Sequence, residues 1–360
     1  MARLGNYVNI RTGKLDANAS SPDGIYPFFT CAVEPLRIDT YSYDCECVLV
    51  AGNGDLNVKY FNGKFDAYQR TYIIESKDKN VLSVPYLFCF LEQYVEVLRE
   101  QSIGGVIKYI KLGNLTETEI SIPRMEEQNR IVAIIEKAKK LVLIRKQQIQ
   151  LHEDLIKARF VEMFGDYNYP NVSLIDLIAE GAGLSYGIVQ PGDDGTGDMG
   201  VLRPVDMVDG RISTASIKYI DRSIGDGFKK TELTGDELLI TVRGTTGITA
   251  LTDKRFVGMN VTRGIAVIRY DRGKINPVYL KAFLNTEESQ RYIQEHTRGA
   301  TLQQINLSDL RVQQIIVPPR EQQELFAAFV QQVDNSKAAI QKSLDETQLL
   351  FDSLMQKYFG

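Results

Sequence analysis

The most constraining feature of this sequence is a long internal repeat. Residues 102–165 can be laid over residues 297–360 at a constant offset of 195 residues, with no gap. The matched pairs include Gly104 and Gly299, Ile110 and Ile305, Pro123 and Pro318, Gln128 and Gln323, and Phe164 and Phe359. A match of this length is hard to obtain by chance, so the chain must use one structural unit twice.

Each copy combines a short apolar strand, a proline and a long helical pattern. Proline suits the first helical turn, where its missing N–H group is not needed, and Pro123 and Pro318 stand at this point. Apolar residues then recur at alternating spacings of three and four, which is the pattern of a coiled-coil seam. The predicted seam residues are Ile131, Ile135, Val142, Ile149, Ile156 and Met163 in the first copy, and Phe326, Val330, Val333, Ile340, Leu344, Phe351, Leu354 and Tyr358 in the second.

Helices of this length need a partner, because an isolated helix is only marginally stable in water. The obvious partner of each copy is the other copy. His152 and Thr347 interrupt the apolar seam at matched positions of the spacing. Polar seam residues commonly set the register of a coiled coil, so we interpret both as packed polar breaks.

The two segments that remain, residues 1–122 and 166–317, have β-rich patterns. Cys47–Gly54 and Leu238–Gly247 each predict an apolar strand followed by a glycine turn, and Arg70–Ser76 and Arg263–Tyr270 each predict a strand opened by arginine. Helices are predicted at Pro85–Ser102 and Pro277–His296, and the second segment has extra residues between Gly187 and Glu237. The chain is therefore predicted to be α+β, with two β-rich domains of mixed or antiparallel sheets and two long helices.

The sequence lacks the motifs of common enzymes. It contains no P-loop, nucleophile elbow, zinc-protease motif or aspartate-rich calcium loop. The glycines of GTGDMG, residues 195–200, fit a dinucleotide fingerprint but have no strand before them and no helix after them, so a loop is predicted. We expect no catalytic residue and no cofactor in this chain.

Metal binding and export are not indicated either. Cys31, Cys45, Cys47 and Cys89 are not completed to a zinc set by a second cysteine pair or a nearby histidine. No apolar run approaches the roughly 18 residues of a membrane span. The start, MARLGNYVNI, lacks the features of a signal peptide, so we expect a cytoplasmic protein.

Charge is distributed unevenly along the chain. The net charge of −4 argues against a simple nucleic-acid-binding domain. However, residues 241–274 contain seven Lys or Arg residues against two aspartates, and Lys59–Arg70 combines Lys and Arg with Asn, Tyr and Gln. Such side chains can contact phosphates and base edges, so local DNA binding is compatible with the acidic total.

The order of these parts resembles the specificity (S) subunit of type I restriction–modification systems. The segments that carry the resemblance are PRMEEQNRIVAIIEKA, residues 123–138, and FVEMFGD, residues 160–166. The resemblance implies target-recognition domains at residues 1–122 and 166–317, and conserved helices at 123–165 and 318–360 that pair as an antiparallel coiled coil with pseudo-two-fold symmetry. It also implies a bipartite double-stranded DNA site read by a non-catalytic subunit.

The same resemblance implies partners. DNA methyltransferase (modification) subunits would use S-adenosylmethionine, and a restriction and translocation subunit would use ATP and Mg²⁺. The residues we expect to read DNA in the second domain are Arg243, Thr245, Thr246, Asn260, Thr262 and Arg263, with Arg298 and Gln303 as outer candidates. Their counterparts in the first domain are Asn53, Lys59, Asn62, Tyr68, Gln69 and Arg70.

Two other functions fit the same sequence. The chain could be the specificity partner of a fused, type II-like methyltransferase–nuclease, or a coiled-coil scaffold with no role on DNA. A neighbouring gene for an adenine methyltransferase, with or without a helicase, would separate these cases. The target bases and the spacer between half-sites do not follow from the sequence, because recognition depends on loop geometry.

Overall fold

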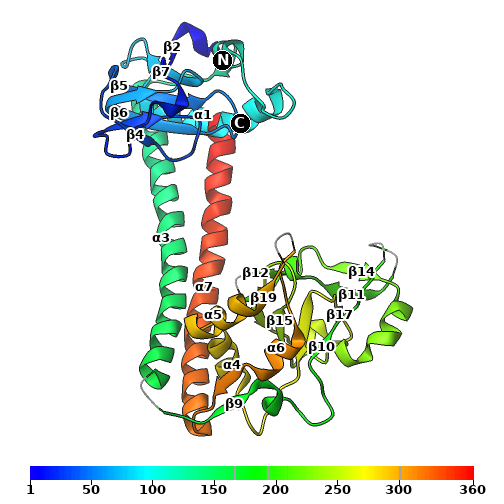
Figure 1. The fold of residues 1–360 in the computed structure, drawn as a ribbon. Helices are drawn as coiled ribbons and strands as arrows, with labels where there is room; N and C mark the ends of the chain where they lie inside the picture. The colour runs from blue at the N-terminus through cyan, green and yellow to red at the C-terminus, as the bar shows by residue number, and fades with distance from the viewer. Residues whose placement is uncertain (166–167, 193–194, 196, 209, 300–301) are drawn as a thin grey trace. The chain divides into compact units, whose positions relative to one another are not determined.

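The computed structural model describes residues 1–165, 168–192, 195, 197–208, 210–299 and 302–360 (Figure 1). The predicted α+β class is confirmed, with β-rich parts and two helices of 40 residues each, α3 (Met125–Phe164) and α7 (Arg320–Phe359). The chain divides into two compact units, residues 1–148 with 340–360 (unit 1) and residues 149–339 (unit 2). Each unit therefore contains part of both long helices.

Unit 1 is built on a six-stranded sheet of order β2-β7-β5-β6-β3-β4, in which only β3 and β6 pair in parallel. The strands are β2 (Val8–Thr12), β3 (Tyr26–Phe29), β4 (Leu36–Ile38), β5 (Tyr43–Ala51), β6 (Val58–Ala67) and β7 (Thr71–Ser76). A short pair, β1 (Ala2–Arg3) with β8 (Glu119–Ile120), and the helices α1 (Val84–Gln101) and α2 (Leu112–Thr116) complete the unit.

Strand β5 is buried on both faces, which explains its nearly continuous apolar run. Val48 and Val50 point to the core shared with α1, whereas Cys47 and Leu49 point to a second core with Phe65. Side chains alternate between the two faces of a strand, so two covered faces require apolar residues at every position.

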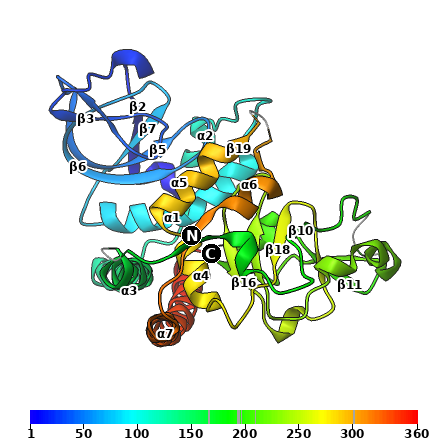
Figure 2. The ribbon, with the colours of Figure 1, turned by 60° about the horizontal axis from the view of Figure 1, so that its bottom comes forward.

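Unit 2 contains a four-stranded sheet of order β10-β18-β15-β16 and a three-stranded sheet of order β14-β11-β17. Figure 2 shows β10, β16 and β18 of the first sheet and β11 of the second. The main strands are β10 (Ser185–Tyr186), β11 (Met199–Leu202), β14 (Lys218–Ile220), β15 (Leu238–Thr241), β16 (Thr249–Leu251), β17 (Asn260–Val261) and β18 (Ile265–Ile268). Short pairs join β12 (Met207–Val208) to β13 (Arg211–Ile212), β19 (Thr297–Arg298) to β20 (Gln304–Ile305), and β9 (Asn171–Ser173) to β21 (Gln314–Ile316). The extra residues of the second segment supply β11 to β14.

The helix predicted at Pro277–His296 is two helices, α4 (Pro277–Leu284) and α5 (Glu287–His296), followed by α6 (Leu307–Val312). The break has a local cause. The hydroxyl of Thr286 accepts a hydrogen bond from Ser289 N and caps a new helix, and glutamates fill its first turn. A capping threonine followed by acidic residues is a helix start, which the apolar pattern of the region hides.

Two predicted motifs fall partly outside the described residues. The residues outside are Thr196 of the GTGDMG segment and Asp166 of FVEMFGD. The last two residues of GTGDMG, Met199 and Gly200, begin strand β11, whereas Gly197 and Asp198 lie in a bend.

A buried glutamine fixes the start of α3 in unit 1. The Gln128 side chain has no exposed surface. Its Oε1 accepts a hydrogen bond from Ser83 N at 2.9 Å, and its Nε2 donates to Val81 O at 2.7 Å and to Pro123 O at 2.8 Å. Ser83 caps α1, so one side chain joins the start of the long helix to the start of the domain helix.

Gln323 makes two equivalent hydrogen bonds at the start of α7 in unit 2. Its Oε1 accepts from Asn276 N and its Nε2 donates to Pro318 O, both at 2.8 Å. Asn276 caps α4, as Ser83 caps α1. Gln128 and Gln323 are matched by the offset of 195. The repeat therefore preserves this set of hydrogen bonds from a buried glutamine, here called the glutamine clamp.

A buried tyrosine repeats in the same way. Tyr86 Oη donates to Ser121 O at 2.9 Å, and Tyr279 Oη donates to Ile316 O at 2.8 Å. The Tyr86 ring contacts Phe359 with ring centroids 5.2 Å apart, and the Tyr279 ring contacts Phe164 at 5.0 Å. Each domain thus meets the start of one long helix and the end of the other.

The long helices run antiparallel within each unit. In unit 1, Ile131 and Ile135 share a core with Met355, and Arg145 donates to Ser343 O and to the Thr347 hydroxyl. In unit 2, Phe160 packs on Phe326, Lys337 forms an ion pair with Glu153, and His152 lies 3.1 Å from the Ser336 hydroxyl. The predicted seam residues that are buried are Ile131, Ile135, Phe326, Val330, Val333 and Leu344, and those that are half-buried are Val142, Ile149, Ile156, Met163, Ile340, Phe351, Leu354 and Tyr358.

Replacement of Gln128 by alanine is expected to destabilise the chain by about 2–4 kcal/mol, because Ser83 N, Val81 O and Pro123 O lose the hydrogen bonds that the buried Gln128 amide makes to them. Denaturant unfolding would measure the loss. The control is Gln147→Ala, on the exposed face of the same helix, which should have little effect. Equal stability of the two variants would show that the clamp contributes nothing.

The coiled-coil seam predicts that two leucines of α7 differ in their contribution to stability. Leu344 is 9% exposed and Leu349, five residues along the same helix, is 69% exposed. Leu344→Asp buries an unpaired charge and should cost about 3 kcal/mol or more, whereas Leu349→Asp should stay within about 0.5 kcal/mol of the parent. Thermal unfolding of both variants checks this. A similar melting temperature for the two would contradict the assigned seam.

Candidate nucleic-acid interface

The candidate residues of unit 2 gather where β15 ends and β18 begins. Thr241, the last residue of β15, pairs with Ile265, the first of β18. One residue beyond this pair, Val242 N donates to Gly264 O at 2.8 Å. Arg243 and Arg263 are the next residues in the two directions, so the antiparallel ladder brings both to one edge of the sheet.

The hairpin of β19 and β20 covers the same edge. Ile305 N donates to Val242 O at 3.0 Å, and Gly244 N donates to Gln303 O at 2.9 Å. Arg243 stands between these two bonds. The hairpin therefore places the outer candidates Arg298 and Gln303, both exposed, next to the predicted readers Arg243 and Arg263.

Ion pairing divides the basic residues of this region into two groups. Four of the seven have carboxylate partners, namely Arg255 with Asp253, Arg269 with Glu237, Arg272 with Asp236 and Lys274 with Asp271. Within the part of the chain that the structure describes, Arg243, Lys254 and Arg263 have no such partner. A guanidinium without a carboxylate at an open edge is the group that a phosphate or a guanine would complete.

Two predicted DNA contacts are buried in the fold instead. Asn260 has no exposed surface, and its Oδ1 accepts from Thr231 Oγ1 and Val261 N, both at 2.8 Å. Thr246 is buried, with its hydroxyl 3.0 Å from that of Thr297. Their polar groups are satisfied inside the domain, so we leave both out of the interface. Thr245 is exposed and Thr262 is half-buried.

In unit 1, four candidates lie on adjoining turns. Gly52 N donates to Arg70 O at 2.8 Å, which brings the turn of Asn53 against the turn of Tyr68, Gln69 and Arg70. Gln69 Nε2 donates to Asp16 Oδ1 at 2.7 Å. The Arg70 side chain is exposed, and among the described residues no carboxylate pairs with it.

Lys59 lies at the same edge, but Asn62 does not. Lys59 is half-buried, its ammonium donates to Asn57 Oδ1, and burial lowers its pKa. Asn62 stands three residues further along β6, opposite Glu46 of β5. Side chains three apart on a strand point to opposite faces, so the structure separates Asn62 from the predicted group.

Unit 1 also has the hairpin found in unit 2. Ile103 and Tyr109 exchange backbone hydrogen bonds of 3.0 and 2.8 Å. Gly54 N then donates to Lys108 O, and Ile110 N donates to Gly52 O, both at 2.9 Å. These bonds repeat those of Gly244 and Ile305 in unit 2, so Asn53 occupies the place of Arg243. Sequence reasoning missed both hairpins, although the matched glycines Gly104 and Gly299 fall within them.

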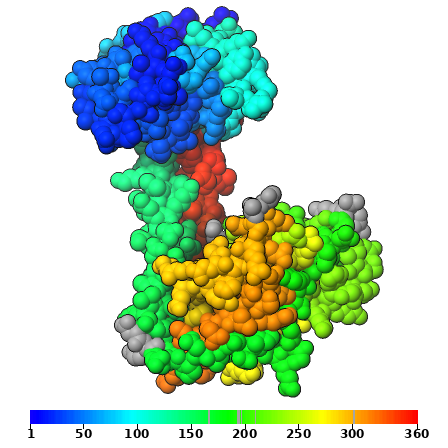
Figure 3. Space-filling view, viewed as in Figure 1, coloured from blue at the N-terminus to red at the C-terminus, as the bar shows by residue number. Residues whose placement is uncertain are grey.

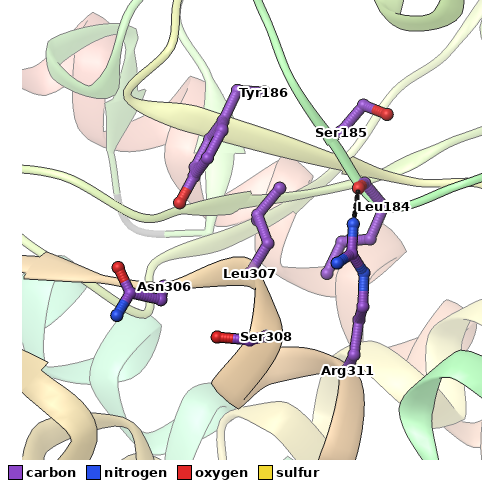
Figure 4. A pocket seen from close by; sticks show the side chains of 7 residues that line it. All are labelled: Leu184, Ser185, Tyr186, Asn306, Leu307, Ser308 and Arg311. Atoms are coloured by element: carbon purple, nitrogen blue, oxygen red, sulfur yellow. Dashed lines mark hydrogen bonds between the residues drawn. The ribbon is translucent and has the colours of Figure 1, made fainter.

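An open hollow of about 570 Å³ lies beside the second hairpin (Figure 4). It is lined by Leu184, Ser185, Tyr186, Asn306, Leu307, Ser308 and Arg311. Arg311 Nη2 donates to Leu184 O at 2.9 Å and holds its two sides together. Asn306 follows β20 directly, so the hydroxyl and amide groups of the hollow extend the polar edge of the hairpin.

The described residues offer no metal site, since no three His, Cys, Asp or Glu side chains among them are placed to hold an ion. The four cysteines are free, and Cys47 and Cys89 are buried. In the same described part, no helix is long and apolar enough to cross a membrane.

Known proteins match this chain both in sequence and in fold. The family model of the type I restriction modification DNA specificity domain matches residues 1–153 and 197–347. The Escherichia coli type I restriction enzyme EcoDI specificity subunit is 41% identical over 128 residues, which are 36% of this chain and 28% of that protein. The E. coli EcoBI specificity subunit is 24% identical over 180 residues, 49% of this chain and 38% of that protein. The matches thus span well under half of these relatives.

Solved structures show the same fold. The crystal structure of a type I restriction–modification S subunit from M. genitalium covers 100% of this chain and 95% of its own, with a TM-score of 0.64 and 14% identity. A chain from a study of complex assembly and conformational transition of the type I R-M system covers 99% and 96%, with a TM-score of 0.57 and 18% identity. Because the family model matches both halves of the repeat, this chain belongs to the type I restriction–modification DNA specificity family.

Proposed function

We propose that this chain is a specificity subunit that reads a bipartite double-stranded DNA site, with one half-site for each β-rich domain. The observation that carries the proposal is the repeated edge. The same backbone hydrogen bonds build it in both units, yet Asn53 stands in one where Arg243 stands in the other. Equal scaffolds with unlike side chains suit two half-sites of different sequence.

The proposed domains are residues 1–122 and 166–317 for recognition, with helices at 123–165 and 318–360 between and after them. The helices start close to these limits, at Met125 and Arg320. We retain Arg243, Thr245, Thr262, Arg263, Arg298 and Gln303 as proposed contacts of the second domain, and Asn53, Lys59, Tyr68, Gln69 and Arg70 of the first.

The proposed partners are DNA methyltransferase subunits and a restriction subunit, which would supply S-adenosylmethionine-dependent methylation and ATP- and Mg²⁺-dependent cleavage. Exposed leucines on the long helices support docking of other subunits there, since Leu143, Leu151 and Leu349 are each more than half exposed. The fused, type II-like partner remains an alternative that these surfaces serve equally. A scaffold without DNA is less well supported, because it gives no reason for arginines left unpaired at the sheet edge.

Arg243→Ala and Arg70→Ala should each lose discrimination in one half-site only, by about 1–3 kcal/mol if the side chain pairs with guanine. Each variant would be assembled with the methyltransferase, and binding measured at fixed salt on the site found methylated in cells and on duplexes with either half scrambled. Arg291→Ala, which removes an exposed ion-paired arginine of α5, is the control. Unchanged affinity for both halves would exclude the two arginines, and equal weakening on every duplex would make them phosphate contacts.

The purified chain alone is expected neither to cut nor to methylate DNA in the presence of ATP, Mg²⁺ and S-adenosylmethionine. The sequence has no motif for nucleotide hydrolysis or nucleophilic catalysis. Gel assays and transfer of a labelled methyl group test this. Activity that copurifies with the chain through several columns and is lost on its depletion would contradict a non-catalytic role.

A further inference from the structure

The hairpin of unit 1 exposes apolar side chains that the fold does not use. Val106 is 103% exposed and Ile107 is 63% exposed, and Ile103 and Tyr109 on its arms are exposed as well. The cyan segment that follows α1 forms part of the unit's outer surface (Figure 3). Neighbouring apolar side chains that stay in water do not stabilise the fold. A cluster of them on the surface is therefore a candidate for contact with another molecule.

The shape of the hairpin is set by its backbone. Gly104 has φ 121° and Gly299 has φ 105°, values that side chains rarely allow. A Cβ at Gly104 would lie 2.5 Å from Ile107 O, and one at Gly299 would lie 2.3 Å from Leu302 O. Both glycines are therefore required for the turn. The side chains that follow them are free to serve a ligand, and Leu302 is also exposed.

The charge of the hairpins points to DNA and not to a basic protein surface. The chain has 46 acidic residues, but none lies between Ser102 and Thr116 or between His296 and Ser308. Lys108 and Lys111 make the first of these stretches positive, whereas Arg298 of the second lies 4.0 Å from the Asp309 carboxylate, just beyond that stretch. An acid-free arm can approach phosphates without repulsion.

Position gives the remaining argument. The second arm of the unit 1 hairpin is bonded to Gly52 and Gly54, on either side of Asn53. Val106 and Ile107 directly precede this bonded arm in the sequence. A duplex in contact with Asn53 would therefore also approach Val106 and Ile107. Apolar side chains that enter a groove next to polar readers can step between base pairs and partly unstack them.

We propose that the hairpin of residues 103–109 is a DNA-contacting arm, whose Val106 and Ile107 side chains pack against bases of the target duplex and unstack a base step. The matched hairpin of unit 2 presents Leu302 in the same way. This inference rests on the proposed function and adds to it a role for shape and deformability of DNA, which polar readout alone does not supply.

The test uses the complete chain assembled with its methyltransferase and duplexes that carry the methylated site. 2-Aminopurine is placed at successive steps of the half-site read by the first domain, where unstacking raises its fluorescence. Val106→Ser with Ile107→Ser should abolish the rise and weaken binding about tenfold, the order expected when a buried aliphatic contact is lost. The matched control is Ile25→Ser, since Ile25 is 69% exposed in the same unit and precedes strand β3, outside the hairpin.

The possible results distinguish failure of the DNA-contacting arm from failure of the proposed DNA recognition. Selective binding by the parent complex, with unchanged affinity and fluorescence in the double variant, would overturn the role of the arm alone. Loss of methyltransferase assembly in the double variant would overturn it too, and would make the hairpin a protein-docking element. A parent complex that bound the site and scrambled DNA equally would overturn the proposed function and the arm together. Retained melting temperature in the double variant, with a lost fluorescence rise, supports the arm.

Discussion

The buried glutamine near the start of each long helix is the interaction on which the other features of the domains depend. Gln128 and Gln323 each donate a hydrogen bond to the carbonyl of a proline that precedes the long helix. Each also accepts one from the backbone N–H of the residue that caps a domain helix. Breaking these bonds would leave a fully buried amide and its backbone partners unpaired, which is costly. Each long helix is therefore held in a fixed position against the domain helix, α1 or α4, that its glutamine contacts. The tyrosines Tyr86 and Tyr279 each add a further hydrogen bond, and their rings contact the end of the other long helix.

These contacts explain why the repeat is kept over both helices. Each domain core needs the start of one helix and the end of the other: Ile131 and Met355 meet in unit 1, and Phe160 and Phe326 meet in unit 2. A helix whose seam lost the register of its partner would therefore expose apolar surface inside a domain as well as between the helices. The same side chains therefore stabilise a domain core and the pairing of the long helices.

Local ion pairing reconciles an acidic chain with the proposed DNA-contacting edge. Most basic residues near β15 and β18 are neutralised by neighbouring carboxylates, and they contribute structure to the domain. Arg243 and Arg263 face the edge without such partners in the described residues. The net charge of the chain therefore does little to attract DNA from a distance. Recognition would depend on short-range contacts at that edge and at the two hairpins.

The sequence by itself determined the repeat, the α+β class, the two long helices and the spacing of their seams, because periodicity and capping are local properties of a chain. It also located the segments of the candidate edge. Only the tertiary structure decided which residues reach that edge. Asn260 and Asn62 have the right chemistry, but one is buried among hydrogen-bond partners and the other faces the opposite side of β6. Hairpins closed by glycine and ion pairs between distant residues depend on three-dimensional packing, which no residue pattern specifies.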